Sequence, residues 1–376
     1  MMYVQVNAIR KIIIAHLYQP STAATNRIVA YAKGFVDAGL EVFLVLGCER
    51  KLELPQLYNV KVIEAVSTHH SSVAREMASA IKEHYQSGNS IILVYGTPVL
   101  CWYLPKSKYK IVYECTEVPF YGRKKTLVSR IKESIKIFLA KRATGMFVIS
   151  HSLKHYFESK GIKNIAVVNM FVDVERFKNV RQEEVKDNYI GYCGTISPFK
   201  DGVDILLKAF SLFHQTHKDY SLKLIGRFES DVAKHYLLSL VEQLKIKDCV
   251  FFTGIVEPER MPSLLGNAMI LALARPDNEQ AKYGFPTKLG EYLATGKPVA
   301  VTNVGEIGCF LKDMCNCRLA KPGDEVDFSE KLDWIADNYE EALHLGAKGR
   351  MLTETEFSSK IQCERALGYM ESLMNI

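Results

Sequence analysis

The segment GFPTKLGEYLATGKPVAVT, residues 284–302, combines a helix start with a carboxylate at a spacing that suits a phosphorylated ligand. Pro286 favours a first helical position, and the Gly and Pro after residue 295 stop a helix, so we predict a helix over residues 286–295. The first helical turn leaves N–H groups without partners, so the loop Tyr283–Thr287 could donate to a phosphate or a sugar hydroxyl. Glu291 lies one turn deeper, roughly 6 Å along the axis, where it could accept from ribose hydroxyls. The alternative is an ordinary amphipathic helix with an exposed glutamate.

Three further loops, each after a predicted strand, carry glycines and cations. In Gly194–Gly202, the first glycine permits close backbone approach, Lys200 follows, and Asp201 could cap the next helix. A fixed ammonium beside a helix start suits a diphosphate. Gly226 and Arg227 form the second loop, and residues 275–285 form the third, which begins with Arg275. Each cation taken alone could equally be a solvated side chain.

The elements that must position these loops follow from hydrophobic patterning. Short apolar runs alternate with amphipathic segments, which is typical of α/β parallel sheets covered by helices on both faces. The predicted strands are Lys11–Ala15, Glu41–Leu46, Val60–Ala65, Ile91–Tyr95, Ile111–Glu114, Met146–Ile149, Ile165–Val168, Tyr189–Cys193, Ser221–Ile225, Cys249–Phe252, Ile270–Ala274 and Val299–Thr302. The predicted helices of the first half are Ala23–Ala38, Ser71–Tyr85 and Lys125–Arg142.

Length favours two domains, because 376 residues with 48% hydrophobic content exceed what one core usually holds. The charged segment 173–188 lacks apolar periodicity and is the expected linker. We therefore expect one domain over residues 1–175, a second over 176–355, and a C-terminal helix over 356–376 that packs back on the first domain. In doubly wound domains ligands bind beyond the carboxyl ends of the strands, where the loops above lie.

Composition narrows the class of protein. The net charge of +6 fits phosphate ligands or an anionic membrane surface better than extended nucleic-acid contacts. Nine scattered cysteines indicate a reducing compartment, and the one close pair, Cys315 and Cys317, has no second pair nearby that would complete a metal site. No apolar run suits a secretory leader or a membrane span, so we expect a cytoplasmic protein that meets membranes only peripherally.

Several motifs together resemble the retaining glycosyltransferases of family 4, which have the GT-B fold of two facing Rossmann-like domains with a deep cleft between them. YCGTISPFKDGVDILLKAF, residues 192–210, resembles the glycine loop and phosphate lysine of that family, and FFTGIVEPERMPSLLGNA, residues 251–268, resembles its nucleobase loop. FVISHSLKHYF and VVNMFVDVERF resemble the segments that close the first domain and enter the linker. The resemblance spans nearly the whole chain and implies a nucleoside diphosphate sugar of UDP or GDP type as donor, with no metal and no other cofactor.

The chain departs from the family pattern at several positions. The first glutamate of the usual pair is Tyr283 here, with Glu279 close by, and the usual arginine after the first loop glycine is Thr195, which leaves Arg227 or Arg275 to compensate. In the first domain, Thr116 replaces a histidine and Glu117 follows it, while residues 18–26 replace a glycine pair.

Carried over residue by residue, the resemblance implies three groups of site residues. As catalytic residues it implies Lys200, Glu279 and Glu117. The implied donor-binding residues are Gly194, Thr195, Lys200, Arg227, Gly254, Ile255, Tyr283, Phe285, Thr287, Lys288 and Glu291. On the acceptor side it implies Asn26, Thr116 and Glu117.

The expected activity is transfer of a sugar, with retention, to a hydroxyl of a saccharide or lipid-linked saccharide, in bacterial polysaccharide or glycolipid assembly. Two alternatives stay open. The departures above also suit a noncatalytic protein of the same fold that binds nucleotide sugars or a partner. A sugar-nucleotide epimerase of GT-B fold would instead show exchange at a sugar carbon without any acceptor. A dinucleotide-dependent dehydrogenase is disfavoured, because no predicted strand is followed by G-x-G-x-x-G.

The segment Arg123–Arg142 has the composition of an interfacial helix. Apolar residues recur at helical spacing, and eight basic residues accompany a single acid, Glu133. The apolar residues are Leu127, Val128, Ile131, Ile135, Phe138 and Leu139, and the basic ones are Arg123, Lys124, Lys125, Arg130, Lys132, Lys136, Lys141 and Arg142. Such a helix is attracted to acidic lipids. The alternative is that the apolar stripe packs against the sheet and only charged residues meet solvent.

Overall fold

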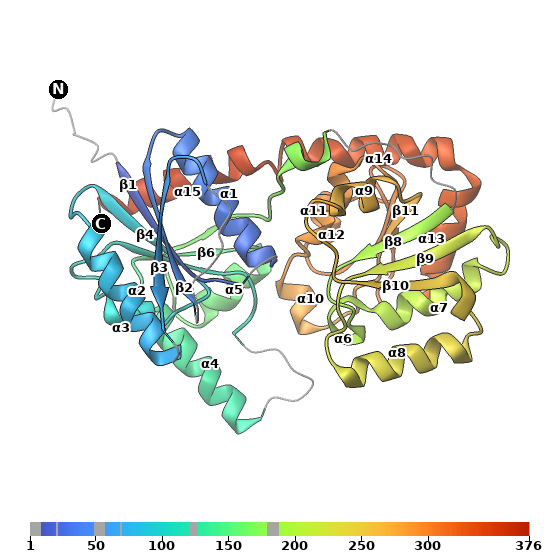
Figure 1. Cartoon of the computed structure of the whole chain (residues 1–376), viewed down its shortest axis with the longest axis horizontal. Helices are drawn as coiled ribbons and strands as arrows, with labels where there is room; N and C mark the ends of the chain where they lie inside the picture. Colours follow the sequence, from blue (N-terminus) through green and yellow to red (C-terminus); the bar gives the residue numbers. More distant parts are fainter. Residues whose placement is uncertain are drawn as a thin grey trace. The chain divides into compact units, whose positions relative to one another are not determined.

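The computed structural model describes residues 9–19, 22–48, 57–67, 70–119, 126–178 and 188–375. The chain divides into two compact units (Figure 1). The first domain comprises the chain up to Asn169 together with the residues from Ser359 onward, and the second comprises Met170–Ser358. The second domain is therefore one continuous segment, whereas the first is completed by the C-terminal end of the chain.

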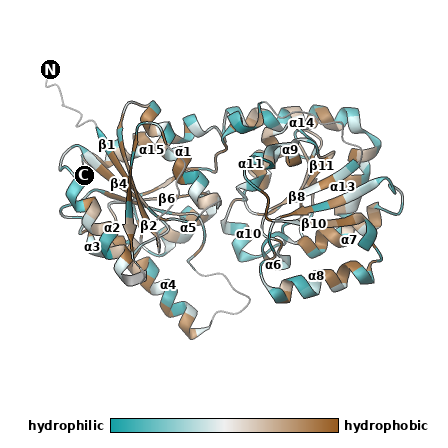
Figure 2. Cartoon of the chain, in the orientation of Figure 1, coloured by the Kyte–Doolittle hydropathy of each residue, from teal (hydrophilic) through white to brown (hydrophobic). Residues whose placement is uncertain are grey.

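The first domain is built on a seven-stranded parallel sheet of order β3-β2-β1-β4-β5-β6-β7. Its interior strand β1 forms because Ile12, Ile13 and Ile14 are fully buried on both faces, as expected of a strand covered by helices on each side. Figure 2 shows the same hydrophobic character along both sheets. The strands are β1 (Lys11–Leu17), β2 (Glu41–Cys48), β3 (Val60–Val66), β4 (Ser90–Tyr95), β5 (Ile111–Cys115), β6 (Gly145–Val148) and β7 (Ile165–Val167).

Helices of the first domain cover this sheet, and the C-terminal helix is one of them. Helix α15 packs on α1, where a Cβ added at Gly34 would lie 2.5 Å from Cys363 Sγ. Gln362 Oε1 accepts a hydrogen bond from the Asn169 backbone N–H at 2.9 Å. The helices are α1 (Ala23–Asp37), α2 (His70–His84), α3 (Leu100–Tyr103), α4 (Leu127–Ala140), α5 (His151–Ser159) and α15 (Ser359–Met374).

The second domain contains a six-stranded parallel sheet of order β10-β9-β8-β11-β12-β13. Strand β13 was not predicted from the sequence, because its three residues include a buried arginine and do not form an apolar run. The strands are β8 (Asn188–Cys193), β9 (Tyr220–Ile225), β10 (Val250–Gly254), β11 (Ile270–Leu273), β12 (Val299–Thr302) and β13 (Arg318–Ala320). The helices are η1 (Val174–Phe177), α6 (Pro198–Asp201), α7 (Val203–Phe213), α8 (Asp231–Gln243), η2 (Lys247–Cys249), α9 (Met261–Gly266), α10 (Glu279–Tyr283), α11 (Lys288–Ala294), α12 (Ile307–Phe310), α13 (Glu325–Asp337) and α14 (Tyr339–Glu354).

Each sheet has one point where the strand order reverses. In the first domain it lies between β1 and β4, and in the second between β8 and β11. The loops that follow these pairs diverge to opposite faces of the sheet and leave a crevice at the carboxyl ends of the strands. The two-Rossmann-domain α/β architecture predicted from the sequence is confirmed, and these two points are where functional residues are expected.

The structure also shows the state of the cysteines and the length of the helices. All nine cysteines are free thiols, including Cys315 and Cys317. Within the described ranges, no helix is both long enough and apolar enough to cross a membrane.

Candidate functional site

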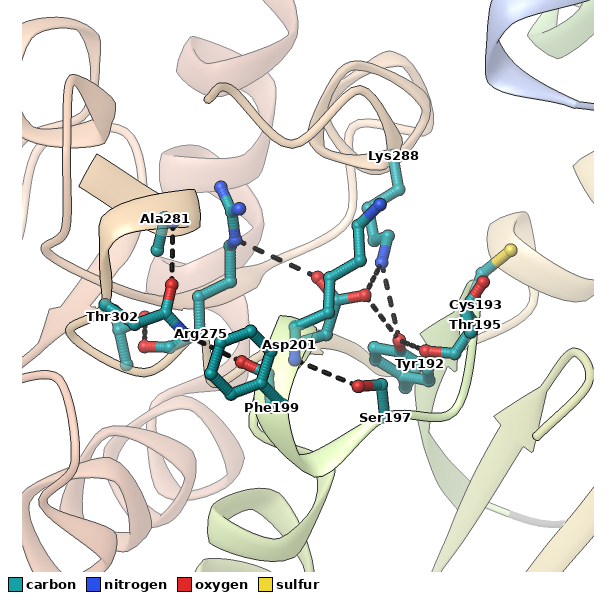
Figure 3. Close-up of polar contacts among 12 residues, drawn as sticks. Tyr192, Cys193, Thr195, Ser197, Phe199, Asp201, Arg275, Ala281, Lys288 and Thr302 are labelled. Carbon is teal, nitrogen blue, oxygen red and sulfur yellow. Dashed lines mark hydrogen bonds and ion pairs between the residues drawn. The ribbon is translucent and has the colours of Figure 1, made fainter. Parts of the chain in front are cut away.

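A buried aspartate, Asp201, lies where the loop that follows β8 meets the loop that follows β11. The Asp201 carboxylate is 2.5 Å from Lys288 Nζ and 3.8 Å from Arg275 Nε, and the Tyr192 hydroxyl lies 3.0 Å from it (Figure 3). The three partners come from β8, the loop after β11 and the start of α11. This acid therefore joins segments that are far apart in the sequence.

The proposed capping role of Asp201 is wrong. Helix α7 begins at Val203 with Gly202 as its N-cap and no side-chain capping bond. Ser197 instead caps the short helix α6, where its Oγ accepts from the Lys200 backbone N–H at 2.9 Å. Asp201 is the last residue of α6, and its side chain turns inward because Lys288 and Arg275 attract it.

Cationic side chains surround the Asp201 carboxylate. Burial alone would raise the pKa of Asp201, but Lys288, Arg275 and also Lys200 outweigh burial and hold that pKa below its ordinary value. Burial lowers the pKa of Lys288, and the attraction of Asp201 opposes this shift. Three cations thus act on one ionised carboxylate. Clustered cations are the groups with which proteins commonly bind phosphates.

Two glycines permit the close packing of these loops. Gly194 has φ +141°, and a Cβ added there would lie 2.5 Å from Lys288 Nζ. Gly202 has φ +64°, and its Cβ would lie 2.0 Å from the Ala274 carbonyl oxygen. A side chain at either position would collide with an atom of the cluster as well as strain the backbone. The loop after β8 therefore passes directly over Lys288, as close backbone approach to a ligand would require.

An asparagine fixes the loop after β11 against the loop after β8. Asn278 Oδ1 accepts from the Ala281 N–H at 2.9 Å and so caps α10, while its Nδ2 donates to the Phe199 carbonyl at 2.7 Å. The Arg275 carbonyl in turn accepts from Thr302 Oγ1 at 2.8 Å. Sequence reasoning overlooked Asn278, although an Asn directly before a Glu at a helix start is a recognisable capping signal.

The helix predicted over residues 286–295 begins later. Helix α11 starts at Lys288 and has seven residues, because α10 ends at Tyr283 and Gly284 then has extended backbone. The Leu289 N–H bonds to the Pro286 carbonyl at 3.0 Å in a tight turn that precedes the helix. Phe285, predicted to bind the donor, buries its ring against Phe310 and Phe357, so only its backbone borders the loop.

Glu291 is held by an arginine that the sequence analysis did not single out. Arg176 Nη1 lies 2.7 Å from Glu291 Oε1, and its Nη2 donates to the Pro258 carbonyl at 3.2 Å. Pro258 belongs to the loop after β10 that begins at Gly254, where φ is +72°. Arg176 thus ties the predicted ribose acid to the predicted nucleobase loop. The one signal for Arg176 was its place in VVNMFVDVERF, the segment expected to enter the linker.

The structure brings most of the predicted donor residues to adjacent loops of the second domain. The Thr195 carbonyl accepts from the Tyr192 hydroxyl at 2.6 Å, and the Arg227 carbonyl accepts from the Ile196 N–H at 2.8 Å. The Gly254 carbonyl accepts from the Gly226 N–H at 2.9 Å. The remaining predicted residues of this domain are the exposed Ile255 and Glu279 and the half-buried Tyr283, Thr287 and Lys200.

The predicted acceptor-side residues lie in the first domain, near the reversal point of its sheet. The Thr116 hydroxyl is 3.0 Å from the Tyr95 hydroxyl, and the Tyr95 ring packs edge-on against His16 at the end of β1. Asn26 is exposed in the first turn of α1, and the Glu117 carbonyl accepts from Cys115 Sγ at 3.0 Å. His16 was not among the predicted residues.

Beneath these residues lies a buried ion pair that the sequence did not predict. Arg27 Nε contacts Glu114 Oε1 at 2.6 Å, and the same guanidinium donates to the carbonyls of Val168 and Asn169 at 2.9 and 2.8 Å. Burial raises the pKa of Glu114, against the effect of Arg27. The pair links α1, β5 and the segment after β7, and so it fixes the base of the acceptor-side loops.

His16 should make the first domain acid-sensitive. Burial lowers its pKa from 6.5 to about 4, so the folded state keeps it neutral while the unfolded state takes up a proton. Stability from this residue is therefore fully present above pH 6.5 and is lost as the pH falls toward 4. Relative to pH 7, the loss at pH 5 should be about 2 kcal/mol. Urea unfolding at both pH values should show a smaller loss for His16→Gln; an equal loss in the two proteins would contradict the assignment.

The second domain matches a family of known proteins. Residues 173–351 match the model of the family described as glycosyl transferases group 1. The chain is 28% identical over 214 residues to the uncharacterized glycosyltransferase MJ1178 of Methanocaldococcus jannaschii, a match that covers 55% of this chain and 53% of that protein. The aligned region thus spans about half the length of this relative.

Solved structures resemble the whole chain. The crystal structure of Anabaena HepE in complex with UDP and glucose has a TM-score of 0.76 at 16% identity, and the match covers 96% of this chain and 100% of that one. Sucrose-phosphate synthase of Thermosynechococcus elongatus has a TM-score of 0.78 at 14% identity, with 97% and 99% covered. At these identities the likeness concerns the fold. The chain therefore has the GT-B fold, which consists of two Rossmann-like domains, and its second domain matches the glycosyl transferases group 1 family over residues 173–351.

Proposed function

We propose that the protein is a retaining glycosyltransferase of family 4 that moves a sugar from a nucleoside diphosphate sugar to a hydroxyl. The observation that carries this proposal is the cluster in which Lys288, Arg275 and Lys200 gather around the Asp201 carboxylate. It lies at the reversal point of the second sheet, where a phosphorylated ligand is expected. The family match over the second domain supports the same activity.

The chemistry asked of these residues is stabilisation of a departing diphosphate. The bond from the anomeric carbon to the diphosphate oxygen breaks, and the acceptor hydroxyl oxygen forms the new bond on the same face, so the configuration is retained. The proton of that hydroxyl passes to the departing diphosphate. Negative charge then grows on the diphosphate, where fixed cations stabilise the transition state more than the ground state. Lys200 and Lys288 would supply this stabilisation, and Gly194, which lets the loop after β8 approach Lys288 Nζ closely, would let the backbone of that loop approach the diphosphate as well.

The other predicted residues take supporting roles in this proposal. Glu291, with Arg176, would hold the ribose, and the loop from Gly254 would meet the base. Tyr283 stands where the family has its first glutamate, and Glu279, at the start of α10, would take the role of that glutamate. In the first domain, Glu117 and Thr116 would meet the acceptor. No metal takes part in this scheme.

We also propose the cytoplasm as the site of action, with a saccharide or lipid-linked saccharide as the acceptor in polysaccharide or glycolipid assembly. Uridine donors are the first to test, because HepE was crystallised with UDP and glucose. GDP sugars form the second group of donors.

A panel of UDP and GDP sugars tests the activity. Each is incubated with the protein, with and without EDTA, and nucleotide release is measured beside thermal stabilisation of the fold. One donor should be turned over, at equal rates with and without EDTA, and NMR of the product should show the anomeric configuration of the donor. An inverted product would exclude retention, and loss of turnover in EDTA would exclude metal independence.

Tyr283 in place of the family glutamate favours a second candidate, a noncatalytic nucleotide-sugar-binding protein of the same fold. Stabilisation by a nucleotide sugar without turnover on any saccharide acceptor would establish this candidate instead. Exchange of hydrogen at a sugar carbon without acceptor would identify an epimerase.

Glu291→Gln should weaken affinity for the nucleoside diphosphate about tenfold, even without the sugar, because ribose hydroxyls donate more strongly to a carboxylate than to an amide. Calorimetric titration measures this affinity. Arg176→Ala is the matched control, since it removes the ion pair but leaves the carboxylate. It should weaken binding less than Glu291→Gln does. Equal affinity of the Glu291 variant and its parent would remove the ribose assignment.

A further inference from the structure

Helix α4 of the first domain exposes a row of large apolar side chains. They are 52–75% exposed, although a helix that covers a parallel sheet normally buries its apolar face. The five residues are Leu127, Val128, Ile131, Ile135 and Phe138. At about 100° per residue they fall within an arc of roughly 100°, so they form one continuous stripe. We refer to these five residues as the α4 apolar face.

The opposite side of α4 is the side that packs on the domain. Its buried residues are Ser129, Ile137 and Ala140. They lie roughly opposite the α4 apolar face by the same helical geometry. The alternative that the whole apolar stripe packs against the sheet is therefore wrong for these five residues. Figure 2 shows hydrophobic and hydrophilic residues intermingled along α4.

Charged residues are distributed unevenly around this helix. Lys132 and Lys136 flank the α4 apolar face on one side, and Arg130 and Lys141 flank it on the other, all of them exposed. The single acid, Glu133, lies on the packed side, where it accepts from the Tyr156 hydroxyl and is 3.6 Å from Lys160 Nζ. Arg123, Lys124 and Lys125, predicted as part of the same segment, lie outside the described residues. In the described part of this segment, the stripe is thus bordered by positive charge alone.

A tryptophan from a second element extends the surface. Trp102 of α3 is 53% exposed, its ring centroid lies 6.3 Å from that of Phe138, and the Arg142 guanidinium stacks over it at 4.6 Å. Tryptophan beside arginine is favoured where a protein meets the headgroup region of a bilayer, since the ring has an apolar body and a polar N–H.

We propose that the α4 apolar face, with Trp102 and the flanking cations, docks the protein on an anionic lipid bilayer. Apolar side chains would enter the boundary between headgroups and acyl chains, while Arg130, Lys132, Lys136 and Lys141 meet acidic headgroups. A second copy of this chain is a poorer partner, because a two-fold contact through this face would set the same cations against each other. The inference stands without the glycosyltransferase activity and goes beyond it.

Vesicle sedimentation tests the proposal. The full chain should bind phosphatidylcholine vesicles that contain about 30 mol% phosphatidylglycerol, and bind phosphatidylcholine alone far less, with binding weakened by salt. Arg130→Glu with Lys132→Glu should lower the affinity about tenfold or more. Ile131→Asn with Ile135→Asn should do the same without a change of charge. Because all four side chains are exposed, these variants should fold.

A matched control and a second readout distinguish docking through the α4 apolar face from nonspecific electrostatic attraction to the vesicles. Lys348→Glu with Lys360→Glu makes the same charge change at exposed lysines of α14 and α15 and should leave vesicle binding nearly unchanged. Trp102 can be observed alone in a Trp334→Phe background, since the chain has two tryptophans. Its emission should shift to the blue with anionic vesicles only.

Several outcomes would overturn the proposal. They are the absence of binding by the parent, equal binding by all variants, or a dimer in solution that the Ile131 and Ile135 substitutions abolish. Donor turnover, measured on the same proteins, reports separately on the proposed activity.

Discussion

Replacing Lys200 with alanine should lower turnover of the nucleotide sugar by about 10²-fold or more, as expected when one fixed donor to a developing charge is lost. The variant should keep its backbone, because the start of α6 is held by Ser197. The Ser197 hydroxyl accepts from the Lys200 N–H at 2.9 Å and donates to Glu229 Oε2 at 2.7 Å, and neither bond uses the lysine side chain. The loss should therefore be one of charge and not of fold.

Steady-state kinetics with the identified donor measure this effect. If the ammonium acts on the transition state, kcat should fall more than KM rises. Lys208→Ala is a suitable control, because Lys208 is a half-buried lysine on α7 whose ammonium lies 3.8 Å from Glu325. Lys200→Arg should retain part of the rate because it keeps the charge. Unchanged turnover of Lys200→Ala with an intact fold would exclude Lys200 from the mechanism.

Asp201→Ala should destabilise the second domain by about 3–5 kcal/mol, because it leaves buried cations without their counterion. The carboxylate is almost completely buried and is the shared partner of Lys288 and Arg275. Its removal would leave two positive charges facing each other in a site with little access to water. Urea unfolding at neutral pH measures the loss.

A double variant distinguishes loss of the counterion from loss of packing. Asp201→Ala combined with Lys288→Met removes one of the orphaned charges, so it should be more stable than the sum of the two single changes predicts. Added inorganic phosphate should stabilise Asp201→Ala more than the parent, since an anion can replace the missing carboxylate. Strict additivity, or an equal response to phosphate, would show that Asp201 acts through packing alone.

The sheets were largely predictable from the sequence, because buried parallel strands are nearly continuous apolar runs. Ile12–Ile14 and Ile270–Leu273 are examples, and both lie where the pattern placed them. β13 was missed because a three-residue edge strand that contains Arg318 has no such run. The start of α11 was displaced because a separate helix, α10, occupies the residues immediately before the loop.

The candidate site was predictable only in part, since spacing along the chain does not reveal which distant side chains meet. The glycine loop and Lys288 were found as local motifs. Asp201 and Lys288 are 87 residues apart, and Arg176 and Glu291 are 115 apart, so their pairing depends on the fold. The same limit applies to α4, whose apolar periodicity predicted a helix but did not indicate which side would face the sheet.

The chain crosses between the two domains twice, and this connectivity makes the second domain an insertion within the first. The two crossings run side by side, because the Val172 N–H donates to the Phe357 carbonyl at 3.2 Å and Val172 forms a parallel bridge with Ser358. Residues 170–358 could therefore be excised as one piece, and a short peptide from Asn169 to Ser359 would reclose the remainder. Simple truncation after residue 175, by contrast, would remove α15 from α1, which packs against it around Gly34. Gene fusions and split-protein designs should therefore keep α15 together with the N-terminal part of the first domain.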